Sequence, residues 1–144
     1  MKFGDPRLPE RFWSKVQAPR SPGGCWLWTA AVEHGGYGRY WSDGSTKSAH
    51  RVAYETLVGA VPDSLQLDHR CRVRNCVNPA HLEPVTGREN TLRGISSPAQ
   101  YARRTQCSNG HELVGRNVMP RKEGGRRCRK CWNDRAKAQR RAAA

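Results

Sequence analysis

The most informative segment of the sequence is Asp68-His69-Arg70-Cys71-Arg72-Val73-Arg74-Asn75-Cys76-Val77-Asn78-Pro79-Ala80-His81. Within it, Cys71, Cys76 and His81 follow one another at intervals of five residues. Zinc prefers four thiolate and imidazole ligands in a tetrahedron, and three of them are present here. Cys25 is the one other cysteine in the N-terminal half, so it is the candidate for the fourth ligand. The pattern predicts a structural zinc that closes a polar loop with no core of its own. The alternative is that these are ordinary buried thiols beside a surface histidine. That interpretation does not explain why three such side chains occur so close together in a polar loop.

His69 lies just before the first cysteine of this loop and directly after Asp68. The zinc geometry is complete without it, and a histidine outside the ligand set suits general base catalysis near neutral pH. Asn90 follows 21 residues later, on a segment expected to be helical. The sequence offers His34 and His50 no such partner, and we assign them no function.

A second group of cysteines and a histidine stands near the C-terminus. Cys107 and His111 are followed by the pair Cys128-Arg129-Lys130-Cys131. A Cys-x2-Cys pair with two further ligands is a strong signal for a zinc knuckle. We therefore predict a second structural zinc bound by Cys107, His111, Cys128 and Cys131. A redox-active pair is the alternative, but the sequence lacks the βαβ setting of such sites.

Apolar periodicity and turn residues predict a small α+β protein. Expected strands cover 25–29, 37–41, a short segment ending at Ser48, 65–68 and 82–86. The first three are expected to form an antiparallel meander. Expected helices cover 9–17, 49–58, about 88–95 and 132–141, and a hairpin is expected around 114–126. A change in composition near residues 95–98 divides the chain into a domain of residues 1–97 and a tail of residues 98–144.

The charge of the chain points to a polyanionic partner. Its formal net charge is +14, and only 36% of its residues are hydrophobic. Nucleic acid is the first candidate partner for such a chain. No apolar run approaches the roughly 20 residues of a membrane helix, and the first residues lack the hydrophobic centre of a signal peptide. We expect an intracellular protein, where paired cysteines bind metals more often than they form disulfides.

The tail carries most of this charge. Residues 103–144 contain 13 Lys and Arg against 3 Asp and Glu. A basic, Ala-rich helix next to a zinc knuckle suits contact with DNA phosphates, although a solvated charged face is the alternative. The residues predicted to bind DNA are Arg126, Arg127, Arg129, Lys130, Arg135 and Lys137.

Several of these segments together resemble the HNH endonucleases of the His-Me finger superfamily, in particular phage homing endonucleases and the His-Cys box homing endonucleases. The segments are Asp68-His69-Arg70-Cys71, Cys76-Val77-Asn78-Pro79-Ala80-His81-Leu82 and Glu89-Asn90. Ala49-His50-Arg51-Val52-Ala53-Tyr54 and Cys25-Trp26-Leu27-Trp28 also look like the phage family. The resemblance covers roughly residues 9–94 and continues in the tail.

The resemblance implies a ββα-metal fold in which His69 activates water as the general base. It implies that Asn90 binds a catalytic divalent ion, Mg2+ or another, and that Asp68 is a second ligand. Arg51 is then a candidate phosphate clamp, with a solvated helix arginine as the alternative. Asn78, which precedes Pro79, is expected to shape the zinc loop rather than to take part in catalysis.

The expected function is therefore metal-dependent, homing-type hydrolysis of phosphodiester bonds in double-stranded DNA by a protein with two structural zinc ions. A phage-encoded enzyme of this kind would act in the cytoplasm of a bacterial host. A zinc-finger protein that binds DNA or RNA without cutting it is the rival interpretation. His-Cys box enzymes are homodimers while many phage enzymes act as monomers, so a homodimer stays open.

Overall fold

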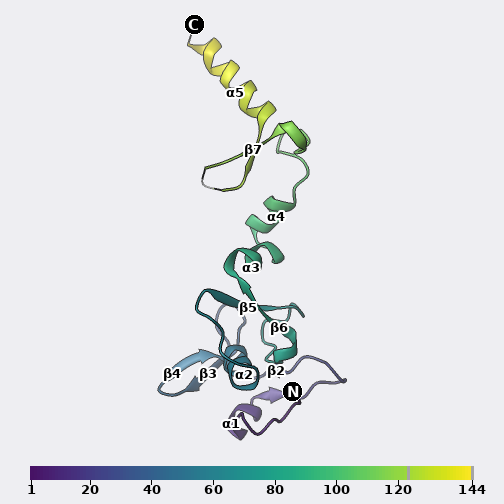
Figure 1. Cartoon of the computed structure of the whole chain (residues 1–144), viewed down its shortest axis with the longest axis vertical. Coiled ribbons are helices and arrows are strands. Elements are labelled where there is room, and N and C mark those ends of the chain that lie inside the picture. Colours follow the sequence, from purple (N-terminus) through teal and green to yellow (C-terminus); the bar gives the residue numbers. More distant parts are fainter. Residues whose placement is uncertain (123, 144) are drawn as a thin grey trace. The chain divides into compact units, whose positions relative to one another are not determined.

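The computed structural model describes residues 1–122 and 124–143, and these form two compact units, Met1–Asn90 and Thr91–Ala144 (Figure 1). Within the described residues the strands form antiparallel pairs, and helices follow or connect them, so the fold is a small mixed α/β arrangement. Each unit contains one of the two Cys/His groups. The functional division expected after residue 97 is a separate prediction that this partition does not test.

The N-terminal part of unit 1 contains a short helix and two separate strand pairs. The elements are α1 (Glu10–Trp13), β1 (Val16–Gln17), β2 (Leu27–Trp28), β3 (Arg39–Ser42) and β4 (Ser45–Ser48). The expected three-stranded meander is wrong, because β2 pairs with β1 while β3 pairs with β4. Residues 16–17, expected to continue the helix, instead form β1 and occupy the edge of β2. The helix therefore ends at Trp13, four residues before the expected end.

The core of unit 1 is mostly aromatic. Phe12 is fully buried and its ring packs against the rings of Trp28 and Tyr40. Gly38 makes this packing close, since a Cβ at that position would lie 2.6 Å from Cγ of Trp28. The core thus forms from side chains that α1, β2 and β3 bring together, which compensates for the low apolar content of the chain. Its buried members are Leu8, Phe12, Val16, Trp26, Trp28, Tyr40, Ala49, Ala53, Leu57 and Val77.

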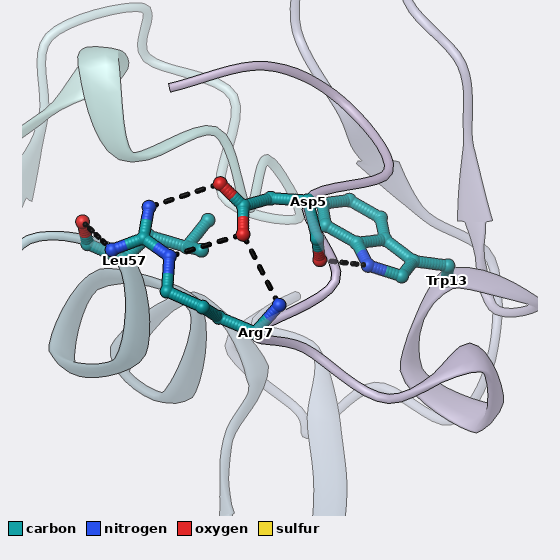
Figure 2. A network of polar contacts seen from close by, with 4 residues as sticks. All are labelled: Asp5, Arg7, Trp13 and Leu57. Atoms are coloured by element: carbon teal, nitrogen blue, oxygen red, sulfur yellow. Dashed lines mark hydrogen bonds and ion pairs between the residues drawn. The ribbon is translucent and has the colours of Figure 1, made fainter.

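A polar network attaches the N-terminal segment to this core (Figure 2). The guanidinium of Arg7 donates to both carboxylate oxygens of Asp5 and, through Nη1, to the carbonyl of Leu57 at 3.2 Å. The indole of Trp13 donates to the backbone carbonyl of Asp5 at 3.0 Å. The hydrogen bonds from Arg7 lower the pKa of Asp5 to about 2, so the carboxylate is charged at neutral pH.

The second half of unit 1 carries the motif residues. It contains α2 (Ala49–Leu57), β5 (Leu65–His69), the 3-10 turn η1 (Pro79–His81) and β6 (Leu82–Thr86), and it ends within α3 (Gly87–Arg93). Strands β5 and β6 form an antiparallel ladder that pairs His69 with Leu82 and Leu65 with Thr86. Thr86 and Glu89 then form a capping box, because each side chain accepts a hydrogen bond from the other residue's backbone N–H. The expected helix start near residue 88 is thereby confirmed.

Unit 2 contains two helices and a hairpin, and its elements are α4 (Ser97–Arg103), η2 (Gly115–Asn117), β7 (Val118–Pro120), β8 (Arg126–Cys128) and α5 (Arg129–Ala142). The expected hairpin is confirmed by the β7–β8 pairing. Helix α4 was not expected, because Pro98 was interpreted as a boundary although proline is also favoured in a first helical turn. Helix α5 begins three residues earlier than expected and includes Cys131. None of the described helices is long and apolar enough to span a membrane.

Candidate functional site

Backbone pairing brings Cys25 to the central motif. The amide of Trp28 donates to the carbonyl of Asn75, and the amide of Val77 donates to the carbonyl of Trp26, both at 2.8 Å. These bonds lay the segment around β2 alongside residues 75–77, so the thiol of Cys25 reaches the loop although it is 46 residues from Cys71. The sequence suggested Cys25 only by elimination, and its proximity follows from this pairing.

The first Cys/His group has the dimensions of a tetrahedral zinc site. Its donor atoms, from Cys25, Cys71, Cys76 and His81, all lie within 4.8 Å of one another. The Sγ atoms of Cys25 and Cys76 are 3.4 and 3.5 Å from Nδ1 of His81. Zinc–ligand bonds of about 2.0–2.3 Å give sulfur–nitrogen edges of roughly 3.5 Å in a tetrahedron, so the residues fit the ion.

The surroundings of this group also suit a bound cation. Nε2 of His81 lies 2.8 Å from the carbonyl of Gly23, which can only accept, so Nε2 carries the proton and Nδ1 is left to act as a ligand. Burial raises the pKa of the Cys76 thiol to about 12, so a cation is needed to favour the thiolate. Asn78 donates to the carbonyl of Gly24 and accepts from the amide of Ala80, which agrees with its expected place in shaping the loop.

The second Cys/His group is formed by Cys107, His111, Cys128 and Cys131, whose donor atoms likewise lie within 4.8 Å of one another. The Sγ atoms of Cys107 and Cys131 are 3.6 Å apart, close to the roughly 3.8 Å edge that zinc imposes between two sulfurs. The hydrogen bond from the backbone of Cys131 lowers the pKa of Cys128 to about 6, which favours its thiolate. Both groups could therefore hold zinc.

The basic residues expected to bind DNA divide into two kinds. Arg126 donates to the backbone carbonyls of Tyr101, Ala102 and Arg104, and Arg129 donates to the carbonyl of Arg116 at 2.7 Å. These two guanidinium groups thus have a role within the fold of unit 2. Arg127 lies over the ring of Trp132, 4.3 Å from its centroid. Lys130, Arg135 and Lys137 are exposed on α5.

His69 is the last residue of β5 and is buried, with 5% of its surface exposed. Its Nε2 lies 2.9 Å from the backbone carbonyl of Cys76. A carbonyl only accepts, so Nε2 carries a proton and the lone pair of a neutral ring lies on Nδ1. Burial lowers the pKa of His69, which favours the neutral ring at neutral pH. Cys76 therefore contributes its thiol to the first Cys/His group, and its backbone carbonyl orients the ring of His69.

Asp68 precedes His69 and is also buried. Its Oδ1 accepts from the guanidinium of Arg72 at 2.7 Å, and about half of the Arg72 side chain is exposed. The carboxylate therefore faces a cation that comes from the surface. Residues two apart on a strand share a face, so Asp68 lies on the same face of β5 as Gln66.

Asn90 lies on α3 and its Nδ2 donates to Oε1 of Gln66 at 2.8 Å, which leaves its own carbonyl oxygen available as a ligand. Both residues line a cavity of about 430 Å3, which we call the Asn90 cavity. Arg51 lines it as well, while its Nε pairs with Glu55 at 2.8 Å and its Nη2 donates to Val61 at 3.0 Å. The lining residues are Glu33, Tyr37, Ser48, His50, Arg51, Gln66, Leu67 and Asn90.

His50, to which the sequence gave no function, lies beside His69. The two ring centroids are 4.8 Å apart, and Tyr37 packs against both rings. Burial lowers the pKa of His50 to about 4, so it is neutral at neutral pH. Its Nδ1 is buried and has no hydrogen-bond partner among the described residues. The helical spacing of His50, Ala53 and Leu57 places the histidine on the buried stripe of α2, a signal that could have revealed it.

Comparison with known proteins finds a family match. The family model described as HNH endonuclease matches residues 47–92, which include His50, His69 and Asn90. The chain is 31% identical over 114 residues to "Protein 2.8" of Escherichia phage T7, a match that covers 78% of this chain and 72% of that protein. The chain therefore belongs to the HNH endonuclease family and resembles its phage members.

Two further phage proteins are similar. "Protein 7.7" of Escherichia phage T7 is 37% identical over 67 residues, which are 46% of this chain and 52% of that protein. The "Uncharacterized gene 5.3 protein" of Enterobacteria phage T3 is 32% identical over 85 residues, which are 51% of this chain and 80% of that protein. The match thus spans only about half the length of Protein 7.7. No solved structure matches the chain.

Proposed function

We propose that the protein is a metal-dependent endonuclease that hydrolyses phosphodiester bonds of double-stranded DNA. The observation that carries this proposal is the buried His69, whose Nε2 proton is directed at a carbonyl so that Nδ1 is a base. A protein that only binds DNA has no need of a neutral histidine held in this way. The family match over residues 47–92 and the net charge of +14 support the same conclusion.

The proposed active site uses a ββα-metal arrangement made of β5, β6 and α3. In this arrangement β5 ends at His69, β6 returns antiparallel to it, and α3 carries Asn90. The hydrogen bond between Asn90 and Gln66 ties the helix to the first strand. The family resemblance and this order of elements support the assignment.

Hydrolysis then proceeds by transfer of a proton to His69. Nδ1 accepts a proton from a water molecule, and the oxygen of that water forms a bond to phosphorus as the bond to the 3′ oxygen breaks. The departing 3′ oxygen takes a proton from solvent water, and His69 afterwards releases its proton to solvent. The hydrogen bond to the Cys76 carbonyl holds the ring in the required tautomer and stabilises its protonated form. The rings of His50 and Tyr37 limit rotation of His69, so we propose both as positioning residues.

Asn90 and Asp68 are the proposed ligands of a divalent ion, for which Mg2+ is the first candidate. HNH nucleases generally use a divalent metal, and when bound it would offset the negative charge that develops on the phosphate and leaving oxygen. Asp68 and Gln66 share a face of β5, and Gln66 bonds to Asn90, which supports a joint site. Arg72 must release the carboxylate for this, and its exposed position permits that movement. Arg51 would contact a phosphate from the cavity wall.

The remaining assignments concern the support and delivery of the substrate. We propose that both Cys/His groups bind structural zinc and that unit 2 binds DNA through Arg127, Lys130, Arg135 and Lys137, with Arg126 and Arg129 chiefly holding its fold. A homing role and a homodimer are further proposals. The phage relatives support one more, action in the cytoplasm of a phage-infected bacterium.

The decisive experiment is cleavage of supercoiled plasmid by zinc-loaded protein with and without added Mg2+. We expect nicked or linear DNA only with the divalent ion. His69→Ala should lower the rate by about 100- to 10,000-fold, the usual contribution of a general base, because no other group takes the proton from water. His34→Ala is the matched control, because His34 is exposed and outside the site.

The same experiment separates the nuclease from its rival. A wild-type protein that binds DNA but leaves it intact with every divalent ion tested would identify a non-catalytic zinc protein. Cleavage by His69→Ala at a rate near the wild type would refute the assignment of the base. Zinc content and a cooperative melt, unchanged in both variants, exclude loss of the fold as the cause.

A further inference from the structure

Unit 2 contains a cavity of about 320 Å3 beside the second Cys/His group. We call it the arginine cavity, because four arginines and two aromatic residues line it: Arg104, Arg121, Arg127, Arg135, Tyr101 and Trp132. The thiols of Cys107, Cys128 and Cys131 form another part of the wall. A zinc ion in that group would close this side and leave the basic and aromatic sides as the binding surface.

The charge of the arginine cavity is not neutralised by the described part of the chain. Arg104, Arg121, Arg127 and Arg135 form no ion pair with any residue among 1–122 and 124–143. Nε of Arg127 is buried and lacks a hydrogen-bond acceptor among the same residues. A buried donor without a partner costs free energy, so an anion with several acceptor oxygens would be favoured here. Phosphate groups have this chemistry.

The aromatic residues indicate that a base is bound as well as a phosphate. Trp132 is 49% exposed and Tyr101 is 47% exposed. A guanidinium lies over each ring. The Cζ atom of Arg127 is 4.3 Å from the ring centroid of Trp132, and that of Arg104 is 5.5 Å from the ring centroid of Tyr101. Aromatic rings and arginine planes in a basic groove are the surfaces on which unpaired bases stack. In a duplex the faces of the bases are covered, and a concave pocket does not enter a groove.

We propose that the arginine cavity binds an unpaired nucleotide of a DNA strand, with its base on Trp132 and its phosphates against the arginines. The choice of DNA rests on the proposed nuclease function, whereas the requirement for an unpaired base comes from the cavity. The cavity volume is at the lower end of small-ligand sites, which suits one nucleotide rather than a folded segment. Unit 2 would then direct the protein to DNA that contains a single-stranded region.

The test measures binding by fluorescence anisotropy with the full chain, loaded with zinc and carrying His69→Ala to prevent cleavage. The probes are a labelled DNA single strand of about 12 nucleotides, the same strand as a duplex, and the RNA of the same sequence. Trp132→Ala should weaken single-strand binding by about tenfold, and Trp132→Phe by less, since stacking on an aromatic ring is lost only in the first. Duplex binding should change far less.

Two variants serve as matched controls. Trp41→Ala removes an indole that is 61% exposed in unit 1, and Arg140→Gln removes a charge from α5 outside the arginine cavity. Arg135→Gln should weaken single-strand binding several-fold more than Arg140→Gln. Trp132 follows Cys131, so the zinc content of each variant is measured. If Trp132→Ala loses zinc, the proposal is judged by the single-strand affinity of zinc-loaded Trp132→Phe and Arg135→Gln, each compared with its control.

The proposal is overturned if zinc-loaded Trp132→Ala and Trp41→Ala bind the single strand equally well. It is also overturned if the duplex loses as much affinity as the single strand, or if RNA binds more tightly than DNA. These results are independent of cleavage. Wild-type protein that fails to cut plasmid refutes the nuclease but not the cavity, whereas a cutting enzyme indifferent to Trp132→Ala refutes the cavity alone.

Discussion

The two Cys/His groups have the same ligand chemistry but lie in different surroundings. The first lies beside an extended apolar core, and its Cys76 is completely buried. The amide of Cys76 donates to the carbonyl of Val73, and its Sγ accepts from the amide of Asn78. In the second unit, the buried apolar residues among those described are only Ala99, Leu113 and Cys128. A core of that size does not offset the loss of chain entropy, so we expect the second unit to depend on a metal bound by its Cys/His group for its fold.

The difference indicates that the two proposed zinc ions would have different tasks. In unit 1 the aromatic core is large enough to support folding by itself. A metal in the first Cys/His group would fix the loop that contains Cys76, whose carbonyl orients His69. In unit 2 the metal group joins the β7–β8 hairpin, the start of α5 and the turn at residues 107–111. Loss of the first ion should therefore affect chemistry more than folding, and loss of the second should affect folding first.

Removal of the metal should produce the largest difference between the two units. Dialysis against a strong chelator should expose the amides of residues 107–131 to hydrogen exchange at the rate of an unfolded peptide. Amides around Phe12, Trp28 and Tyr40 should keep protection of at least about 100-fold, because their core contains no ligand. Exchange measured by mass spectrometry checks this outcome. Equal loss of protection in both units at one chelator concentration would contradict it.

Substitutions of single proposed ligands in unit 1 test whether Cys76 has a function that Cys71 lacks. Cys76→Ala should lower cleavage by about 100-fold or more, because the residue whose carbonyl holds His69 also loses its link to the metal. Cys71→Ala should cost at least about tenfold less, since Cys25, Cys76 and His81 can still bind an ion around that carbonyl. Plasmid cleavage and zinc content are measured for both. Equal losses of cleavage would argue against a special function for Cys76.

The sequence predicted which cysteines and histidines lie together, largely because most of their spacing is local, while their binding of zinc stays a prediction. Cys71, Cys76 and His81 lie on one short loop, and the structure brings Cys25 to them as expected. The capping box at Thr86 and Glu89 is likewise a pattern of nearby residues. In the Cys/His groups and in the capping box alike, only a few types of side chain or backbone group can serve as a partner.

Features that depend on long-range packing were missed. β2 pairs with β1 rather than with β3, and no periodicity in the sequence distinguishes this pairing from a meander. His50 meets His69 only because α2 packs beside β5, so a contact between residues 19 apart has no spacing rule to reveal it. Similarly, Arg126 was grouped with the DNA-binding residues by its charge, whereas backbone carbonyls surround its guanidinium. Its contribution to DNA binding stays a prediction.

The smallest effect concerns the network of Asp5 and Arg7, which stabilises unit 1 without any metal ligand (Figure 2). The pKa of Asp5 is about 2 in the folded chain against an ordinary value of 3.8, so its stabilisation is present above the ordinary value. It is lost as the pH falls through about 2, where the folded carboxylate takes up its proton. Asp5→Asn should therefore lower the Tm of unit 1 by about 1–3 °C at pH 6, and this difference should shrink as the pH falls from 4 to 2.

Asp63→Asn is the matched control, because it makes the same charge change at an exposed residue for which no salt bridge is found in the described chain. Near-ultraviolet circular dichroism of the aromatic core reports the melting of unit 1, and comparison of variants at each pH cancels the loss of zinc in acid. If Asp5→Asn and Asp63→Asn melt together at pH 6, the network adds nothing to the core. Unit 1 would then owe its independence from zinc to aromatic packing alone, because the segment before α1 would be held by Leu8 and Phe12 rather than by its charges.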